Sequence, residues 1–341
     1  MAADKREWVS RAFHNEKVEK VPAGFWFHFT PDEVLDGFQH PEMFEQNMGG
    51  HLKYYREFQP DFVKIMSDGF FIYPNREFQE AETAADLRKV SSIGPNHPWI
   101  EKQVEFVKKL TAVFGKEVLS FYNIFSPATC FKFSRRSSTK APEVLLGEFI
   151  REDREALIHA LNIAAEDLAV LARRVITEGG ADGIYFSAQD PNQDGSNIDA
   201  ETHRRVFAPA DALVLEAANA AAGRGPGKGG ALNILHVCGY AGRRNDLGRF
   251  TGYPAQIINW AVTIEGVPLG EGKKLFGGRP VIGGFGNTTE GILYRGTEAE
   301  IKAETRRILD EAGRTGVVLG ADCTVPRDID LRHLQWVREA V

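Results

Sequence analysis

The stretch REDREALIHALNIAAEDLAVLARRVITEGG, residues 151–180, is followed at once by ADGIYFS, residues 181–187. In the first part, apolar residues recur three and four positions apart and stop at a Gly pair, which is the pattern of an amphipathic helix that ends there. The second part is a short apolar run of the kind that forms buried strands. A helix that leads directly into a buried strand is the repeating unit of an α/β fold with parallel strands.

Seven further runs of the second kind occur along the chain, with helical patterns between them. They are AGFWFHF (23–29), FVKIM (62–66), EVLSFYNIF (117–125), ALNILHV (231–237), AQIINWAV (255–262), RPVIGGF (279–285) and TGVVLGA (315–321). Eight buried strands joined by helices match a closed (β/α)8 barrel of the TIM type better than an open doubly wound sheet. A chain of 341 residues is within the range of one such barrel with insertions, so we expect a single domain, 1–341.

Three flanking segments complete the expected organisation. Residues 3–16, ADKREWVSRAFHNE, predict an N-terminal helical extension that lies across the bottom of the barrel. Thr297 followed by Glu300 has the capping-box pattern that begins a helix, and Gly313 predicts where this helix ends. The Gly-rich stretch 221–231 predicts a surface loop.

The composition is that of a globular protein, because 43% of the residues are hydrophobic and their burial can offset the entropy of ordering the chain. The net charge is −6 without a basic stripe, so we expect no nucleic-acid partner. The first residues carry charges where a secretory signal needs an apolar core, and no window is long enough for a membrane span. These features predict a cytoplasmic protein, in which three cysteines are thiols or metal ligands.

The four residues HVCG, 236–239, place His236 and Cys238 at the end of the fifth run. Side chains two apart on a strand point the same way, roughly 6 to 7 Å apart, and both can bind one zinc ion. Cys323 follows the last run, and barrel closure brings it to the same rim, so three ligands leave the open position of a catalytic zinc site. Alone, the His-x-Cys pair also fits a core histidine beside an inert thiol. Cys130 is interpreted as a plain thiol, with a role at the mouth of the barrel as the alternative.

Six blocks of the sequence carry a family resemblance. They are REWVSRAFHNEKVEKVPAGFWF, IMSDGFFIYPN, GADGIYFSAQD, LHVCG, GFGNT and GVVLGADCTVP. Together they resemble the uroporphyrinogen decarboxylase superfamily over nearly the whole chain. The pairing of HVCG with a late CTVP cysteine resembles its zinc-dependent methylcobalamin:thiol methyltransferase branch, of the coenzyme M type. The order His-x-Cys…Cys is also similar to the zinc domain of cobalamin-independent methionine synthase.

This resemblance implies that Zn2+ on His236, Cys238 and Cys323 activates a thiol, which exchanges a methyl group with a corrinoid (methylcobalamin) or folate carrier. Zinc lowers the pKa of a thiol from about 8.5 and keeps its sulfur anionic. A glutamate is also implied as a further ligand; Glu265 is the best positional match and a candidate catalytic residue, while Glu271 and an exposed helix remain open alternatives. The chain has no corrinoid-binding module, so a separate carrier protein is the implied partner, beside a small thiol or methylated substrate.

A decarboxylase acting on a tetrapyrrole is the alternative within the same superfamily. Its polycarboxylate substrate requires arginines at the mouth of the barrel, and His28 and Asp32 stand in their place here. Asp68, in MSDGF, matches the aspartate that the decarboxylases use against pyrrole nitrogens. Asp68 is therefore a candidate catalytic residue, with a helix cap as the alternative, and His28 is a candidate substrate contact.

Gln189 and Asp190 follow the run 181–187, at the strand ends where barrel enzymes bind their substrates. Both are candidate substrate contacts, with a simple turn before Pro191 as the alternative. A barrel that binds a ligand without catalysis is a third possibility for the whole chain, which metal analysis separates from the enzyme. The methyl donor, the acceptor and the oligomeric state stay open, with a homodimer as one option.

Overall fold

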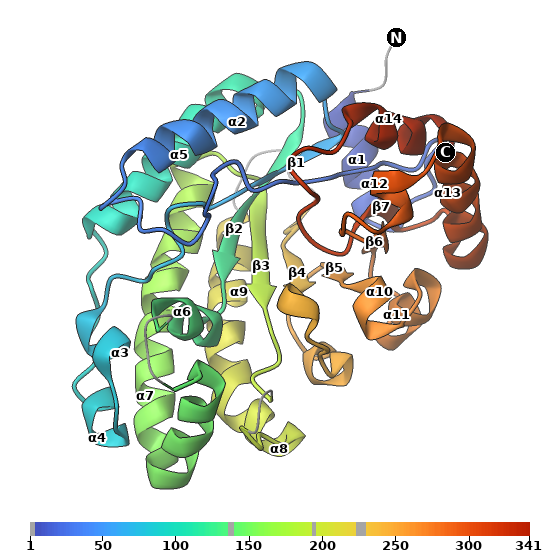
Figure 1. The fold of residues 1–341 in the computed structure, drawn as a ribbon. Coiled ribbons are helices and arrows are strands. Elements are labelled where there is room, and N and C mark those ends of the chain that lie inside the picture. Colours follow the sequence, from blue (N-terminus) through green and yellow to red (C-terminus); the bar gives the residue numbers. More distant parts are fainter. Residues whose placement is uncertain (1–3, 136–139, 193–195, 223–229) are drawn as a thin grey trace.

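The structure is a computed structural model of the chain, and it describes residues 4–135, 140–192, 196–222 and 230–341. Among these residues, seven parallel strands form one sheet, in the order of the sequence (Figure 1). The strands are β1 (Phe62–Ile65), β2 (Leu119–Phe125), β3 (Gly183–Ala188), β4 (Ile234–Val237), β5 (Ile257–Trp260), β6 (Val281–Phe285) and β7 (Val317–Ala321). Most of the Gly-rich stretch predicted as a loop, 223–229, lies outside the described residues.

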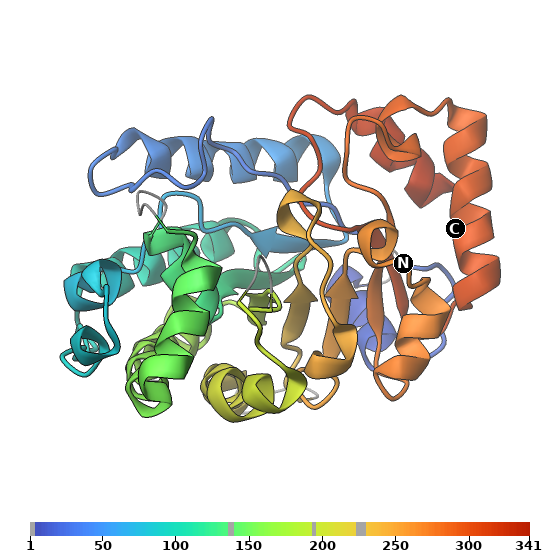
Figure 2. The ribbon, with the colours of Figure 1, turned by 60° about the horizontal axis from the view of Figure 1, so that its bottom comes forward.

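Helices surround the outside of this sheet, which is curled rather than flat (Figure 2). They are α1 (Lys5–Phe13), α2 (Glu42–Phe58), α3 (Arg76–Glu80), α4 (Ala84–Leu87), α5 (Pro98–Phe114), α6 (Pro127–Ser134), α7 (Pro142–Thr177), α8 (Ala200–Thr202), α9 (Ala208–Ala222), α10 (Val262–Glu265), α11 (Leu269–Leu275), α12 (Ile292–Arg295), α13 (Glu298–Ala312) and α14 (Leu331–Glu339). A π-helical turn, η1 (His203–Phe207), and two 3-10 turns, η2 (Tyr240–Gly242) and η3 (Leu247–Phe250), lie between them. No helix in the described ranges combines the length and the apolar character that a membrane crossing requires.

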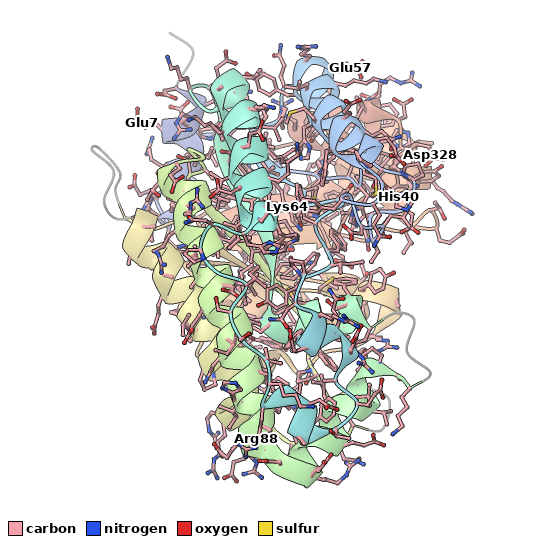
Figure 3. All side chains as sticks on the ribbon, turned by 90° about the vertical axis from the view of Figure 1, so that its left-hand side faces the viewer. Glu7, His40, Glu57, Lys64, Arg88 and Asp328 are labelled. Atoms are coloured by element: carbon pink, nitrogen blue, oxygen red, sulfur yellow. The ribbon has the colours of Figure 1, made fainter. Side chains whose placement is uncertain are left out.

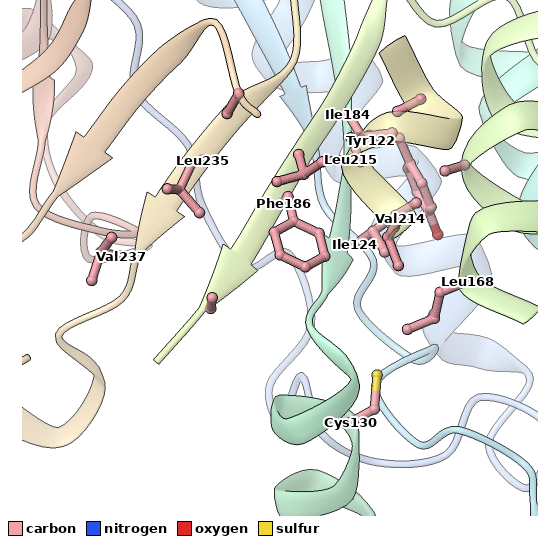
Figure 4. Packing of buried hydrophobic residues seen from close by; sticks show 14 of the residues in the cluster. Tyr122, Ile124, Cys130, Leu168, Ile184, Phe186, Val214, Leu215, Leu235 and Val237 are labelled. Atoms are coloured by element: carbon pink, nitrogen blue, oxygen red, sulfur yellow. The ribbon is translucent and has the colours of Figure 1, made fainter. Parts of the chain in front are cut away.

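The outer layer is built by the alternation that the sequence shows. Leu168 of α7 and Val214 and Leu215 of α9 are buried in one cluster with side chains of the central strands, among them Ile124 and Ile184 (Figure 4). Because successive residues of a strand point to opposite faces, these residues fill the space under the helices while their neighbours face the interior of the curled sheet.

Two helix boundaries show how local sequence sets the elements. The long helix predicted from residue 151 is present as α7, but it begins earlier, at Pro142, and is interrupted at Asp153, whose φ of −158° and ψ of 92° are not helical. The predicted capping box is confirmed in α13, where the side chains of Thr297 and Glu300 each accept a hydrogen bond from the other residue's backbone N–H. This helix ends at Gly313 with a φ of 78°, a value that favours glycine.

The prediction of an eighth strand at 23–29 is wrong, and the expected closed barrel is not formed. This segment meets the sheet through a single parallel bridge between Ala23 and Leu319 of β7. On the side of β1, carboxylates replace strand partners: the N–H of Ala23 donates to Asp61 at 2.9 Å, and another N–H of the segment donates to Asp68 at 2.7 Å. The described strands therefore make a curled half-barrel that is consistent with the TIM type but is not a closed ring.

The predicted N-terminal helix is present as α1 and covers the bottom of the curled sheet. Its Val9, Ala12 and Phe13 are buried against apolar side chains in the N-terminal halves of the strands, namely Phe62, Phe121, Ile234, Ile257, Ile282 and Val318. Arg6 of the same helix makes an ion pair with Asp182, with 2.5 Å between the two groups. Since α1 covers this end, the C-terminal ends of the strands are the end at which a site can form.

Candidate metal centre

The three residues predicted as metal ligands come together at the C-terminal end of the sheet. His236 lies in β4, Cys238 follows this strand directly, and Cys323 lies in the loop after β7. The sulfur atoms of the two cysteines are 3.9 Å apart, and one ligand atom from each of the three residues lies within 4.8 Å of the others. Tetrahedral zinc with Zn–S bonds of about 2.3 Å separates two sulfur ligands by roughly 3.8 Å. The sulfurs therefore already have the spacing that a shared zinc ion requires.

The imidazole ring of His236 is held in one orientation by its neighbour on β5. Asn259 is the register partner of His236, and its Oδ1 accepts hydrogen bonds from His236 Nδ1 at 2.5 Å and from the Tyr185 hydroxyl at 2.9 Å. The amide group of Asn259 is itself fixed because its Nδ2 donates to the carbonyl of Ile282 at 2.9 Å. Nδ1 of His236 therefore carries the proton, and Nε2 keeps a free lone pair.

Nε2 of His236 is buried and has no hydrogen-bond partner within the described part of the chain. A buried polar atom without a partner is costly, and native structures contain few of them. A metal ion shared with the two sulfurs would give this nitrogen its partner, and a histidine ligand commonly donates its other N–H as His236 does here. The residues present thus fit a zinc ion with two sulfur ligands and one nitrogen ligand.

The two thiols share a proton unequally. The hydrogen bond from the Cys238 thiol lowers the pKa of Cys323 well below its usual range, with Lys64 acting in the same direction against the effect of burial. The same bond, together with burial, raises the pKa of Cys238. The pair therefore favours the thiolate on Cys323, and a thiolate is the form of cysteine that binds metals.

Cys130 lies apart from this pair. It lies in α6 and points into the apolar packing between the sheet and α7, among residues such as Leu168 (Figure 4). Burial raises the pKa of the Cys130 thiol, so it stays protonated. Its interpretation as a plain core thiol agrees with this position.

A cavity of about 450 Å³ opens beside the triad. This volume is within the range of roughly 300 to 1,000 Å³ that is typical of small-molecule sites. Three aromatic residues, Phe71, Phe125 and Phe133, form part of its wall. Two further basic residues besides the histidine of the triad line it, His28 and Lys64.

Lys64 extends from β1 into this cavity and is only 5% exposed. Of the residues labelled in Figure 3, it is the one that is buried. Its ammonium group lies 4.1 Å from the centroid of the Tyr185 ring and 5.3 Å from that of Trp26. Burial lowers the pKa of Lys64 to about 8, although nearby acidic groups, Cys323 first among them, act in the opposite direction.

Asp68 acts through His28 rather than on the cavity itself. Asp68 is fully buried and is not part of the cavity lining, whereas His28 is. One oxygen of Asp68 accepts a hydrogen bond from Nδ1 of His28 at 2.8 Å, and the other accepts the N–H of Phe29 at 2.7 Å. Burial alone would lower the pKa of His28, but the hydrogen bond and the charge of Asp68 outweigh it, so the pKa is raised. Asp68 thus lies behind His28 and can position this ring, and its role as a catalytic residue stays a prediction.

We expect the substitution Asp68→Asn to lower the pKa of His28, because it removes the carboxylate and leaves the effect of burial. A raised pKa in the folded state contributes stability below the unfolded value of about 6.5 and loses it as the pH rises through the folded pKa. The variant should therefore lose more stability at pH 5.5 than at pH 8.5. NMR titration of the His28 ring and urea denaturation at both pH values measure this, and an equal loss at both values would contradict it.

The family model of uroporphyrinogen decarboxylase (URO-D) matches residues 73–341. The chain belongs to this family. A comparison with curated proteins found no match.

Several solved structures share the fold of this URO-D family member. A methyltransferase from Methanosarcina mazei is 16% identical, with a TM-score of 0.72, and the match covers 99% of this chain and 98% of that one. A B12-independent methionine synthase from Shewanella sp. W3-18-1, in complex with selenomethionine, is 14% identical with a TM-score of 0.53, covering 94% and 95%. A putative B12-independent methionine synthase from Listeria monocytogenes is also 14% identical, with a TM-score of 0.51, covering 95% and 97%. At these identities the likeness shows the fold.

The two predicted substrate contacts after β3 have different positions in this URO-D family member. Gln189 lines the cavity; its Nε2 donates to the carbonyl of Cys238 at 3.3 Å, and its Oε1 accepts from Lys132 at 2.8 Å. Asp190 is buried outside the cavity lining and makes an ion pair with Arg249 at 3.1 Å. Gln189 can therefore contact a ligand and also supports the Cys238 backbone, whereas Asp190 holds two loops together.

Glu265, the candidate fourth ligand, lies outside the His-Cys-Cys cluster. Its carboxylate accepts hydrogen bonds from the backbone N–H of Asn245, at 2.9 Å, and from the side chain of Asn245, at 2.8 Å. Asn245 in turn donates to the carbonyl of Cys238 at 3.2 Å. Glu265 is thus linked to the candidate ligand Cys238 only through Asn245, and it helps to position the loop that contains Cys238.

Sequence reasoning missed Asn259, Tyr185 and Lys64. The signal that could have identified two of them is a polar residue inside an otherwise apolar strand run, Lys64 in FVKIM and Asn259 in AQIINWAV. A polar side chain at a buried strand position requires a partner, so it marks either a site or a hydrogen-bond network. Tyr185 carries no such signal because tyrosine is common in strands.

Proposed function

We propose that this chain is a zinc-dependent methyltransferase that moves a methyl group between a corrinoid or folate carrier and a thiol. The zinc ligands in this proposal are His236, Cys238 and Cys323. When bound, zinc would lower the pKa of a coordinated thiol and keep its sulfur anionic and nucleophilic near neutral pH. The carrier belongs to a partner protein that docks at the open end of the sheet.

The observation that carries this proposal is the convergence of three candidate zinc ligands, one of which is already held in the orientation that metal binding requires. Two sulfurs at 3.9 Å and an imidazole with a buried, unpartnered Nε2 converge beside a cavity. Asn259 fixes the ring of His236 so that this nitrogen keeps its lone pair. Two anionic sulfur ligands with one neutral histidine leave a zinc site that is formally neutral, which favours a thiolate nucleophile over a metal hydroxide.

The comparisons support the proposal at the level of the reaction class. The chain belongs to the URO-D family, and the solved structures that share its fold include a methyltransferase and a methionine synthase. The dependence on zinc, the corrinoid and the carrier protein are our inference from the residues and from the resemblance described above.

The decarboxylase alternative has less support in the cavity. A polycarboxylate substrate needs arginines as anchors, and the described lining of the cavity beside the triad contains none. Arg327 lines the adjoining hollow, where its guanidinium donates to the carbonyls of Thr30 and Pro31. Asp68, which would contact pyrrole nitrogens, is turned toward His28 and the backbone of residue 29. Carbon dioxide release from uroporphyrinogen is therefore expected to be absent, and its appearance would favour this alternative.

The test uses protein purified without a histidine tag and loaded with zinc. We expect it to convert free methylcobalamin and a thiol, with 2-mercaptoethanesulfonate, homocysteine and thiophenol as probes, into the methyl thioether. In this step the sulfur–carbon bond forms, the cobalt–carbon electron pair stays on the corrinoid, and the thiol proton is released. Thioether is measured by mass spectrometry under anaerobic conditions. A rate that survives chelation of the metal, or no thioether from any of the three thiols, would contradict the proposal.

A further inference from the structure

We propose that the cavity binds an organic anion with a flat apolar body, with its negative group on the ammonium of Lys64 and its body against Phe71, Phe125 and Phe133. These three phenylalanines are called the aromatic wall below. The proposal names the substrate class of the site and rests on the proposed methyl transfer, because it places the ligand of this cavity beside the metal triad.

Lys64 is a buried basic residue whose ammonium group has no acidic partner among the described residues. It is 5% exposed and lines the cavity. Among the described residues, its ammonium group has no hydrogen bond and no ion pair, and it lies over the faces of Tyr185 and Trp26. Burying a charge without a partner is strongly unfavourable, and contacts with aromatic faces offset only part of this cost. A negative group in the cavity would supply the missing partner.

The metal triad does not supply this partner once it is loaded. A divalent ion with two cysteinates and a neutral histidine is formally neutral, so the two sulfurs no longer offset the charge of Lys64. Glu33 also lines the cavity but makes no ion pair with Lys64 in the described part of the chain. The loaded cavity therefore has one basic group at its floor without an acidic partner, and a bound anion is the group that would keep this amine protonated.

The aromatic wall consists of three rings that pack against one another. The ring centroids of Phe71 and Phe125 are 4.5 Å apart, those of Phe71 and Phe133 are 5.0 Å apart, and those of Phe125 and Phe133 are 4.9 Å apart. Phe71 follows β1, Phe125 ends β2, and Phe133 lies on α6, so three separate elements hold the rings against one another. Aromatic rings pack favourably against flat apolar groups. A ligand with a flat apolar body fits such a wall better than a small hydrophilic anion.

Benzoate is the probe for this site, and it is compared with benzamide, which has the same shape without the charge, and with acetate, which lacks the body. We expect the zinc-loaded protein to bind benzoate about tenfold or more tightly than benzamide, the effect of one hydrogen bond to a charged group. Lys64→Met should reduce benzoate binding to the level of benzamide. Phe133→Ala should reduce the advantage of benzoate over acetate. Binding is measured by NMR titration of each ligand.

Lys109→Met is the matched control, since Lys109 lies on α5 and makes a surface ion pair with Glu105. It should bind benzoate as the unsubstituted protein does. Lys64→Gln serves as a second variant if Lys64→Met does not fold, as judged by circular dichroism. Equal binding of benzoate and benzamide, or unchanged benzoate binding in the folded Lys64 variant, would overturn the proposal. The second result would mean that Lys64 only balances a thiolate on the metal.

The same preparations separate this proposal from the proposed function. Zinc content and methyl transfer from methylcobalamin are measured on each of them. Lys64-dependent benzoate binding without zinc or methyl transfer would leave the anion site standing and remove the methyltransferase. Methyl transfer without Lys64-dependent benzoate binding would remove the anion site and leave the methyltransferase.

Discussion

Cys238→Ala and Cys323→Ala should each lower the bound zinc from about one ion per chain to nearly none. Each substitution leaves only two of the three protein ligands, and structural integrity of such a site depends on all of them. The remaining cysteine of the chain, Cys130, lies in the apolar core, so no other thiol can take the place of either sulfur. Elemental analysis of protein purified without a histidine tag measures the content directly.

Cys130→Ala is the matched control for these variants. It also removes one thiol, but Cys130 lies in the apolar core away from the cavity lining, so zinc content should not change. Thermal unfolding adds an independent measurement, because a ligand that binds only the folded state raises its stability with concentration. Added zinc should raise the midpoint for the unsubstituted protein and for Cys130→Ala, but not for Cys323→Ala. Full zinc occupancy in both triad variants would refute the ligand assignment.

Asn259→Leu should weaken zinc binding by roughly 10- to 100-fold, the usual effect of removing the partner that orients a histidine ligand. Leucine cannot accept the proton of His236 Nδ1, so the ring loses the bond that fixes its orientation and its tautomer. The hydroxyl of Tyr185 loses its acceptor at the same time. Competition with a chromophoric zinc chelator gives the dissociation constants.

Asn259→Asp separates this effect from a general disturbance of the core. Aspartate keeps the oxygen that accepts from His236 but loses the N–H that donates to the carbonyl of Ile282. We therefore expect Asn259→Asp to hold zinc much more tightly than Asn259→Leu. Equal losses in the two variants would show that the bond to Ile282, and not the one to His236, supports the site.

The sequence by itself predicted most of the helices and strands and the meeting of the three candidate ligands at one end of the sheet. Residues 151–180 have the apolar spacing of a helix and residues 181–187 that of a buried strand, and these patterns predicted α7 and β3. Such predictions work because the local spacing of apolar residues decides which side chains can be buried on one face. The triad could also be predicted, since His236 and Cys238 are two apart on a strand and every parallel strand ends at the same edge. Cys323 needed only the assumption that β7 runs in the same direction as β4.

The tertiary structure alone decided how the sheet ends and what surrounds the ligands. Residues 23–29 have the composition of a strand, but Asp61 and Asp68 take hydrogen bonds that a strand partner would have taken. The hydrogen bond between His236 and Asn259 joins residues 23 positions apart, and the one between His28 and Asp68 joins residues 40 positions apart. Such partners are set by register and by packing across the interior of the sheet, and these depend on the whole chain and not on any local pattern.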